Sequence, residues 1–106
     1  MYQKERDATV KMFVATCRWY DLPVSIGQDG NTWVADGYGE HECSPVLELN
    51  IYRLYMFSLD LSIGDETLAL GGIPMVEADV AWWRDVLEVI RVAVVRARSG
   101  KSIVQW

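Results

Sequence analysis

Hydrophobic and polar residues alternate from Val46 to Ile63, and this stretch is the strongest structural signal in the chain. Every second position there is apolar apart from Arg53, and the other row carries polar side chains at Glu48, Asn50, Ser58, Asp60 and Ser62. A period of two predicts half-buried β-structure with one face on a core and the other towards water. Because eighteen residues are too many for one strand of a small domain, we expect a bend, bulge or tight reversal at Tyr52-Arg53-Leu54.

The start of this stretch also allows a different interpretation. Ser44-Pro45 is a favourable beginning for a helix, and a helix over residues 44–54 would place Leu47, Ile51, Leu54 and Tyr55 on one face. The alternation favours strand, but the choice between strand and helix for residues 44–54 stays open at this point.

Periodic patterns on either side predict the remaining elements. Helical spacing indicates a helix from Ala8 to about Tyr20, capped by Asp7 and ended by Asp21-Leu22-Pro23. A second helix is expected from about Ala78 to Arg98, with Ser99-Gly100 as its stop. Between the two helices we expect a hairpin of residues 24–26 with 32–35, a returning strand at 67–70 and a break in the sheet at the glycines of 71–74. After the second helix, the tail (101–106) is expected to form an edge strand or remain free.

These elements predict one α+β domain spanning residues 1–106. Its core would be an antiparallel β-sheet of about four or five strands, flanked by an N-terminal and a C-terminal helix packed on one face. The chain has no internal repeat and no linker long enough to separate two domains.

Composition narrows the setting of the protein. Hydrophobic residues make up 51% of the chain, which is enough for a core, and no apolar run approaches the roughly 20 residues that span a bilayer. The N-terminus is polar, without the apolar segment of a secretory signal. Two cysteines, Cys17 and Cys43, are too few for a disulfide framework. We therefore expect a cytoplasmic protein with reduced thiols and no membrane partner.

The net charge of −5 is unevenly distributed. Residues 21–79 hold eleven acids and one base, Arg53, whereas residues 1–20 and 80–106 both carry more bases than acids. An acidic middle disfavours direct binding of nucleic acid. The same field attracts a protein partner with a basic surface.

Candidate chemistry is sparse. His41 and Cys43 lie two apart, as a metal pair or a Cys–His nucleophile would, but the chain has one histidine and lacks the four ligands of a structural zinc site. The pattern places Asp60, Asp65 and Glu66 around the turn after the long strand, where carboxylates more often keep a strand end solvated than act as an acid–base pair. No nucleotide-binding or catalytic motif is present. We expect no enzyme, no cofactor and no metal.

Aromatic residues supply candidate contact surfaces. Trp82 and Trp83 point about 100° apart on the second helix, so Trp82 is either core under the first helix or a binding or homodimer face. Trp19, with Met12, forms a second apolar patch. Arg53, alone on an apolar row, would pair with a carboxylate, mark a bend or reach a partner.

These features favour a small acidic protein that binds a basic, possibly nucleic-acid-binding, partner protein as a stoichiometric inhibitor or regulator. In size and charge it is similar to antitoxins, immunity proteins and phage anti-defence proteins such as anti-CRISPR proteins. The expected contact residues are six acids and two tryptophans (Asp29, Asp36, Glu40, Glu42, Asp65, Glu66, Trp82 and Trp19).

Two alternatives stay open. The run from Asp21 to Ile26, followed by Asp29-Gly30 and a returning strand, resembles the opening of type III secretion effector chaperones. That resemblance implies an acidic dimer, although the chain is shorter than that family's pattern. A third class is a small-ligand-binding domain, or an enzyme without a recognisable motif, which a pocket containing His41 or Arg53 would favour.

Overall fold

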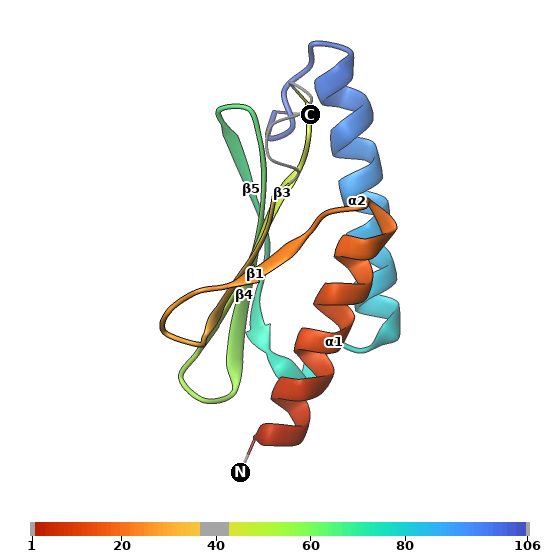
Figure 1. Cartoon of the computed structure of the whole chain (residues 1–106). Helices are drawn as coiled ribbons and strands as arrows, with labels where there is room; N and C mark the ends of the chain where they lie inside the picture. Colours follow the sequence, from red (N-terminus) through yellow and green to blue (C-terminus); the bar gives the residue numbers. More distant parts are fainter. Residues whose placement is uncertain (1, 37–42, 106) are drawn as a thin grey trace.

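The fold is a five-stranded antiparallel sheet with two helices on one of its faces (Figure 1). The computed structural model describes residues 2–36 and 43–105. Neighbouring strands in the chain are neighbours in the sheet, in the order β1-β2-β3-β4-β5. The elements are α1 (Gln3–Trp19), β1 (Val24–Ile26), β2 (Thr32–Asp36), β3 (Val46–Tyr52), β4 (Met56–Ile63), β5 (Glu66–Pro74), the short 3-10 helix η1 (Met75–Glu77) and α2 (Val80–Arg98). The predicted α+β fold class is confirmed.

A tight reversal divides the long alternating stretch into two strands. β3 and β4 pair over their whole lengths, from Val46 opposite Ser62 to Tyr52 opposite Met56. Residues 46–52 are therefore strand, which settles the open choice between strand and helix. Arg53 and Leu54 form the turn with φ of 51° and 65°. Arg53 interrupts the apolar row because it lies in this turn, after the end of β3. The alternation of buried and half-buried residues resumes in β4, with Phe57 buried.

The core lies between the inner face of the sheet and the two helices. Alternate residues of β3 and β4 are buried, as the period of two predicts. From α2, the Trp83 ring stacks on Phe57 with centroids 6.0 Å apart. The fully buried side chains are mostly aliphatic and aromatic (Phe13, Leu47, Leu49, Phe57, Leu59, Leu61, Trp83, Ile90 and Ile103 among them).

The first helix begins earlier than predicted. α1 starts at Gln3, and Asp7 lies inside the helix, where its carboxylate accepts a hydrogen bond from Gln3 Nε2 at 2.8 Å. Capping preference suggested Asp7, but the polar residues before it are themselves good helix formers and extend the helix by about a turn. The buried stripe also includes two threonines, and the Thr16 hydroxyl donates to the Met12 carbonyl at 2.8 Å.

The Gly71–Pro74 segment continues β5 instead of breaking the sheet, so that prediction is wrong. Gly71 is opposite Leu59, one residue beyond a bulge in the ladder, and the strand runs to Pro74. A β-carbon on Gly71 would lie 2.9 Å from the Trp82 ring, so the glycine lets the indole pack against the strand. Proline is tolerated at the end of an edge strand, where one peptide nitrogen in two points out of the sheet.

The tail is neither an edge strand nor free. Ile103 is 1% exposed, and Glu66 accepts hydrogen bonds from the Ser102 hydroxyl and from the Ile103 backbone N–H. Arg96 of α2 donates to the carbonyls of Ser102 and Gln105 at 2.8 and 3.0 Å. These contacts hold the C-terminus against the start of β5. No helix in the described part of the chain is long and apolar enough to cross a bilayer.

Candidate functional site

The face of the sheet away from the helices is not covered by any described helix or strand, and its strands carry no basic residue (Figure 1). The five strands contain no lysine, arginine or histidine. Of their four acids, Asp36, Glu48 and Asp60 lie in the outward row, whereas Glu66 pairs with buried Ile63 and contacts the C-terminal tail. Along β3 and β4 the polar row of the alternation faces outward and is only half-buried. The β-meander thus turns the acidic middle of the sequence into one acidic surface, which we call the open face.

Two carboxylates are directly opposed at the centre of the open face. Glu48 of β3 pairs in register with Asp60 of β4, which places their β-carbons about 4.5–5.5 Å apart. Like charges in this position repel each other and destabilise the strand pair by a few tenths of a kcal/mol. The neighbouring outward positions are small or uncharged: Val34 on one side of Glu48 and Ala69 on the far side of Asp60. No strand residue therefore supplies a cation to this pair.

The opposite layer of the molecule carries bases at regular spacing. Lys4, Lys11 and Arg18 recur every seven residues on the exposed side of α1, and Arg84, Arg91 and Arg98 do the same on α2. Exposed acids on the same helices are fewer (Asp7, Asp85 and Glu88). The molecule is therefore electrostatically two-faced, with an acidic sheet surface and a helical surface richer in bases.

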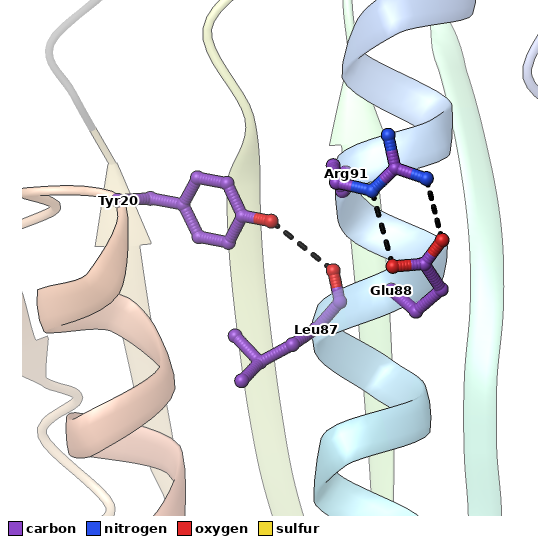
Figure 2. A network of polar contacts seen from close by, with 4 residues as sticks. All are labelled: Tyr20, Leu87, Glu88 and Arg91. Atoms are coloured by element: carbon purple, nitrogen blue, oxygen red, sulfur yellow. Dashed lines mark hydrogen bonds and ion pairs between the residues drawn. The ribbon is translucent and has the colours of Figure 1, made fainter.

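Figure 2 shows two polar contacts of the helical layer: one links α1 to α2, and the other pairs Arg91 with Glu88. The Tyr20 hydroxyl, just beyond α1, donates to the Leu87 carbonyl of α2 at 3.1 Å. Burial raises the pKa of Tyr20, which keeps the hydroxyl protonated as a donor. On the solvent side Arg91 forms two hydrogen bonds to Glu88 and lowers the pKa of that carboxyl. Both side chains are about 60% exposed, so this pair adds little stability.

The end of the sheet nearest the start of α1 carries a cluster of exposed large side chains. The turn between β3 and β4 presents Tyr52, Leu54 and Tyr55, which are 39%, 80% and 43% exposed, together with exposed Arg53. Tyr55 is held by a tilted ring contact with Tyr2, with centroids 5.9 Å apart. We call residues 52–55 the exposed turn. A groove of about 710 Å³ lies between this turn, the β1–β2 loop and the first turn of α1.

The other charged groups of that groove are already engaged within the protein. Arg6 donates to the Gly30 carbonyl and to Asn31 Oδ1, and its guanidinium lies 5.1 Å from the Trp33 ring centroid. Asp29 accepts from the Asn31 backbone N–H at 2.9 Å, a bond that lowers the pKa of its carboxyl. The Arg53 guanidinium has no hydrogen bond or ion pair within the described residues, although its backbone carbonyl accepts from the Tyr55 N–H at 2.7 Å. The groove consequently brings together no pair of free groups suited to acid–base chemistry.

The predicted contact acids lie at both ends of the sheet. Asp29 is in the β1–β2 loop, whereas Asp65 and Asp36 are at the far end, about 25 Å of strand away. Glu66 lies at that far end too, but its carboxylate holds the C-terminal tail. Glu40 and Glu42, together with His41, lie outside the described residues. Asp29 and Asp65 therefore lie at opposite ends of the sheet, so the described contact acids do not form one cluster.

The two predicted tryptophans have different surroundings. Trp19 is 74% exposed at the end of α1. Trp82 is half-buried, with its ring edge-to-face against Phe57 and Trp83 at centroid distances of 5.4 and 5.0 Å and its far edge on Gly71. The structure therefore places Trp82 partly buried against the sheet, and its role as a binding or dimer face stays a prediction.

Sequence reasoning did not identify the Glu48–Asp60 pair. Asp60 lies in β4 on the open face, as the alternation predicted, and not in a cluster with Asp65 and Glu66 around the turn. The two carboxylates meet because the reversal is centred on Leu54, which puts residues of equal distance from the turn opposite each other. The alternation predicted that both residues face outward. Their pairing also depends on the exact position of the turn, which the sequence pattern did not predict.

Comparison of the chain with protein-family models, with characterised proteins and with solved structures finds no match.

Proposed function

We propose that this protein acts in the cytoplasm, without a catalytic role, by docking its open face on the basic surface of a partner protein. It would serve as a stoichiometric inhibitor or regulator of the antitoxin, immunity or anti-defence type. The observation that carries the proposal is the uncovered sheet face whose strands contain no base and whose centre holds the opposed Glu48 and Asp60. A lysine or arginine from a partner would relieve the repulsion between these carboxylates.

The charge distribution supports one orientation of docking. Because the helical layer carries Lys4, Lys11 and Arg18 on one helix and three arginines on the other, a basic partner is repelled from that side and attracted to the sheet. Such asymmetry raises the rate of association and fixes the orientation of the encounter more than it raises the affinity.

The test begins with a pull-down from the lysate of the source cell, eluted with a salt step and identified by mass spectrometry. One dominant basic partner released by salt is the expected result. Association rates are then compared for Glu48→Lys and Asp85→Lys, two variants with the same net charge, one on the open face and one on α2. Glu48→Lys should slow association roughly tenfold at low salt, and Asp85→Lys should not.

Equal rates for these two variants would reject the open face as the docking surface. Glu48→Lys should not unfold the protein, since it converts a like-charge cross-strand pair into an ion pair with Asp60 and is expected to stabilise it slightly. Loss of binding in that variant is therefore separable from loss of structure.

A dimeric secretion chaperone is the second candidate, because such a protein needs an apolar groove. One of about 460 Å³ lies between α1 and β1, lined by Val10, Val14, Ile26 and Trp33 among others. A light-scattering mass of a dimer without a basic partner in the pull-down would favour the chaperone. A monomeric mass would count against it.

A further inference from the structure

We propose that the exposed turn, residues 52–55, is the specificity anchor of the docking surface, with Leu54 filling an apolar pocket of the partner protein and Arg53 pairing with a carboxylate at its rim. This inference rests on the proposed function and adds the chemistry that selects one partner among basic proteins.

Backbone conformation is the first step of the argument. Arg53 and Leu54 both adopt positive φ, of 51° and 65°, a region in which an L side chain is crowded against its own carbonyl. Tight hairpin turns with two such residues are built without strain by Asn-Gly. This chain places a long cation and a branched aliphatic residue at these two positions.

Nothing within the described molecule compensates for that strain. Leu54 is 80% exposed, the largest exposure among the large hydrophobic side chains described. The Arg53 side chain is exposed and has no hydrogen bond or ion pair in the described residues. Strain at a non-glycine residue persists only where something favours that residue. Because neither side chain has a hydrogen bond or ion pair within the described residues, we attribute the presence of Arg53 and Leu54 here to a contact with another molecule.

The composition and position of the turn indicate a protein partner. Tyrosine and arginine are enriched among the residues that dominate binding energy at protein interfaces, in desolvated pockets near the interface centre. Tyr52 and Tyr55 flank the tip, and Tyr55 is fixed by its ring contact with Tyr2. The turn also directly joins the two strands that carry Glu48 and Asp60, so the tip and the acidic pair belong to one continuous surface.

Arg53 has a specific part in this arrangement. It is the single base between residues 21 and 79, so it meets repulsion wherever the partner is uniformly basic. One acidic group beside the apolar pocket converts this repulsion into a charge-assisted hydrogen bond and sets the register of docking. The partner is therefore a basic surface interrupted by an apolar pocket with a carboxylate.

The test replaces the turn tip by the unstrained sequence in the double variant Arg53→Asn with Leu54→Gly. Removal of two strained conformations should raise the thermal midpoint by about 5–10 °C, so a loss of binding cannot come from unfolding. The wild type, this variant, Glu48→Lys and Asp85→Lys are each immobilised and exposed to the same lysate, and captured proteins are quantified by mass spectrometry.

The inference predicts that the basic protein retained by the wild type falls at least tenfold with the turn variant and stays unchanged with Asp85→Lys. If the turn variant keeps this protein while Glu48→Lys loses it, the proposed function stands and the anchor is rejected. If the turn variant loses it while Glu48→Lys keeps it, the anchor stands and docking by the open face is rejected. If the wild type retains no basic protein, both are rejected.

Three further results would overturn the anchor. A thermal midpoint that does not rise in the turn variant would show that Arg53 and Leu54 are unstrained and need no external contact. Flotation of the wild type, but not the variant, with phosphatidylcholine–phosphatidylserine vesicles would assign the tip to a membrane. A dimeric wild type with a monomeric variant in light scattering would assign it to a second copy of this chain.

Discussion

Gly71 and Gly72 are adjacent glycines of β5, and we expect them to respond oppositely to the same substitution. An alanine β-carbon at Gly71 would lie 2.9 and 3.2 Å from two ring carbons of Trp82 and 3.7 Å from the ring of Phe57. At Gly72 the added carbon meets nothing within 4 Å. The pair isolates the packing of Trp82 on the strand from the general effect of replacing glycine.

The magnitude follows from the two opposing effects. Ordinary carbon–carbon contacts are about 3.5–4.0 Å, so Gly71→Ala overlaps the indole by more than half an ångström. Trp82 cannot retreat freely, because its ring is held edge-to-face against Phe57 and Trp83. Overpacking of this kind costs about 1–3 kcal/mol, and the reduced entropy of the unfolded chain returns about 0.4–1 kcal/mol.

Gly71→Ala should therefore lose about 1–2 kcal/mol of stability, and Gly72→Ala should be neutral or gain up to about 1 kcal/mol. Urea unfolding of both variants, followed by tryptophan fluorescence and circular dichroism, gives the two free energies. In the Gly71→Ala background, Trp82→Ala should cost about 1 kcal/mol less than in the wild type, because there the truncation also relieves the clash. Equal stabilities for the two alanine variants would refute this account of Trp82.

The remaining predictions concern a thiol and the C-terminal tail. Burial raises the pKa of the Cys17 thiol to about 12 from 9.0, so the folded state holds this proton where the unfolded chain loses it. The contribution of this thiol to folding stability is complete below pH 9 and falls by up to about 1.4 kcal/mol per pH unit towards pH 12. Denaturation at pH 8–11 should therefore show a shallower decline of the unfolding free energy for Cys17→Ala than for the wild type. A thiol reagent at pH 8 should modify Cys43 but not Cys17 in the native protein. Glu66→Ala removes the acceptor of the Ser102 and Ile103 hydrogen bonds. It should therefore lower the free energy of unfolding by about 1–3 kcal/mol and expose the tail to limited proteolysis. A tail that stays protected from the protease would contradict this role of Glu66.

Local sequence patterns predicted correctly the features that depend on a single helix or strand. The alternation in residues 46–63 predicted the buried face of β3 and β4, because a strand places successive side chains on opposite faces whatever its neighbours are. The α2 pattern likewise predicted a helix ending at Arg98 before Ser99-Gly100. The reversal at Tyr52-Arg53-Leu54 was expected from length alone, although the residues there are not those that favour a tight turn.

Errors occurred where a contact with a distant element overrides a local preference. The glycines at positions 71 and 72 suggested a break in the sheet, but pairing with β4 and the indole of Trp82 keep them in β5. The tail lacked a pattern of its own, and Glu66, thirty-six residues before Ser102, determines where it lies. The same contact engages the carboxylate of Glu66, which the sequence analysis expected to contact a partner.

The sequence by itself determined the fold class, the buried faces of the central strands and the acidic sign of the middle segment, because each depends on the composition or periodicity of one continuous stretch. Tertiary structure alone decided that Glu48 and Asp60 are opposed, that the bases lie on the opposite layer, and that Arg53 and Leu54 project from the end of the sheet. The register of pairing and the side of the sheet that the helices cover bring distant residues together, and no local pattern records these distances. The surface proposed for binding is accordingly a product of the β3–β4 turn and of the helix packing.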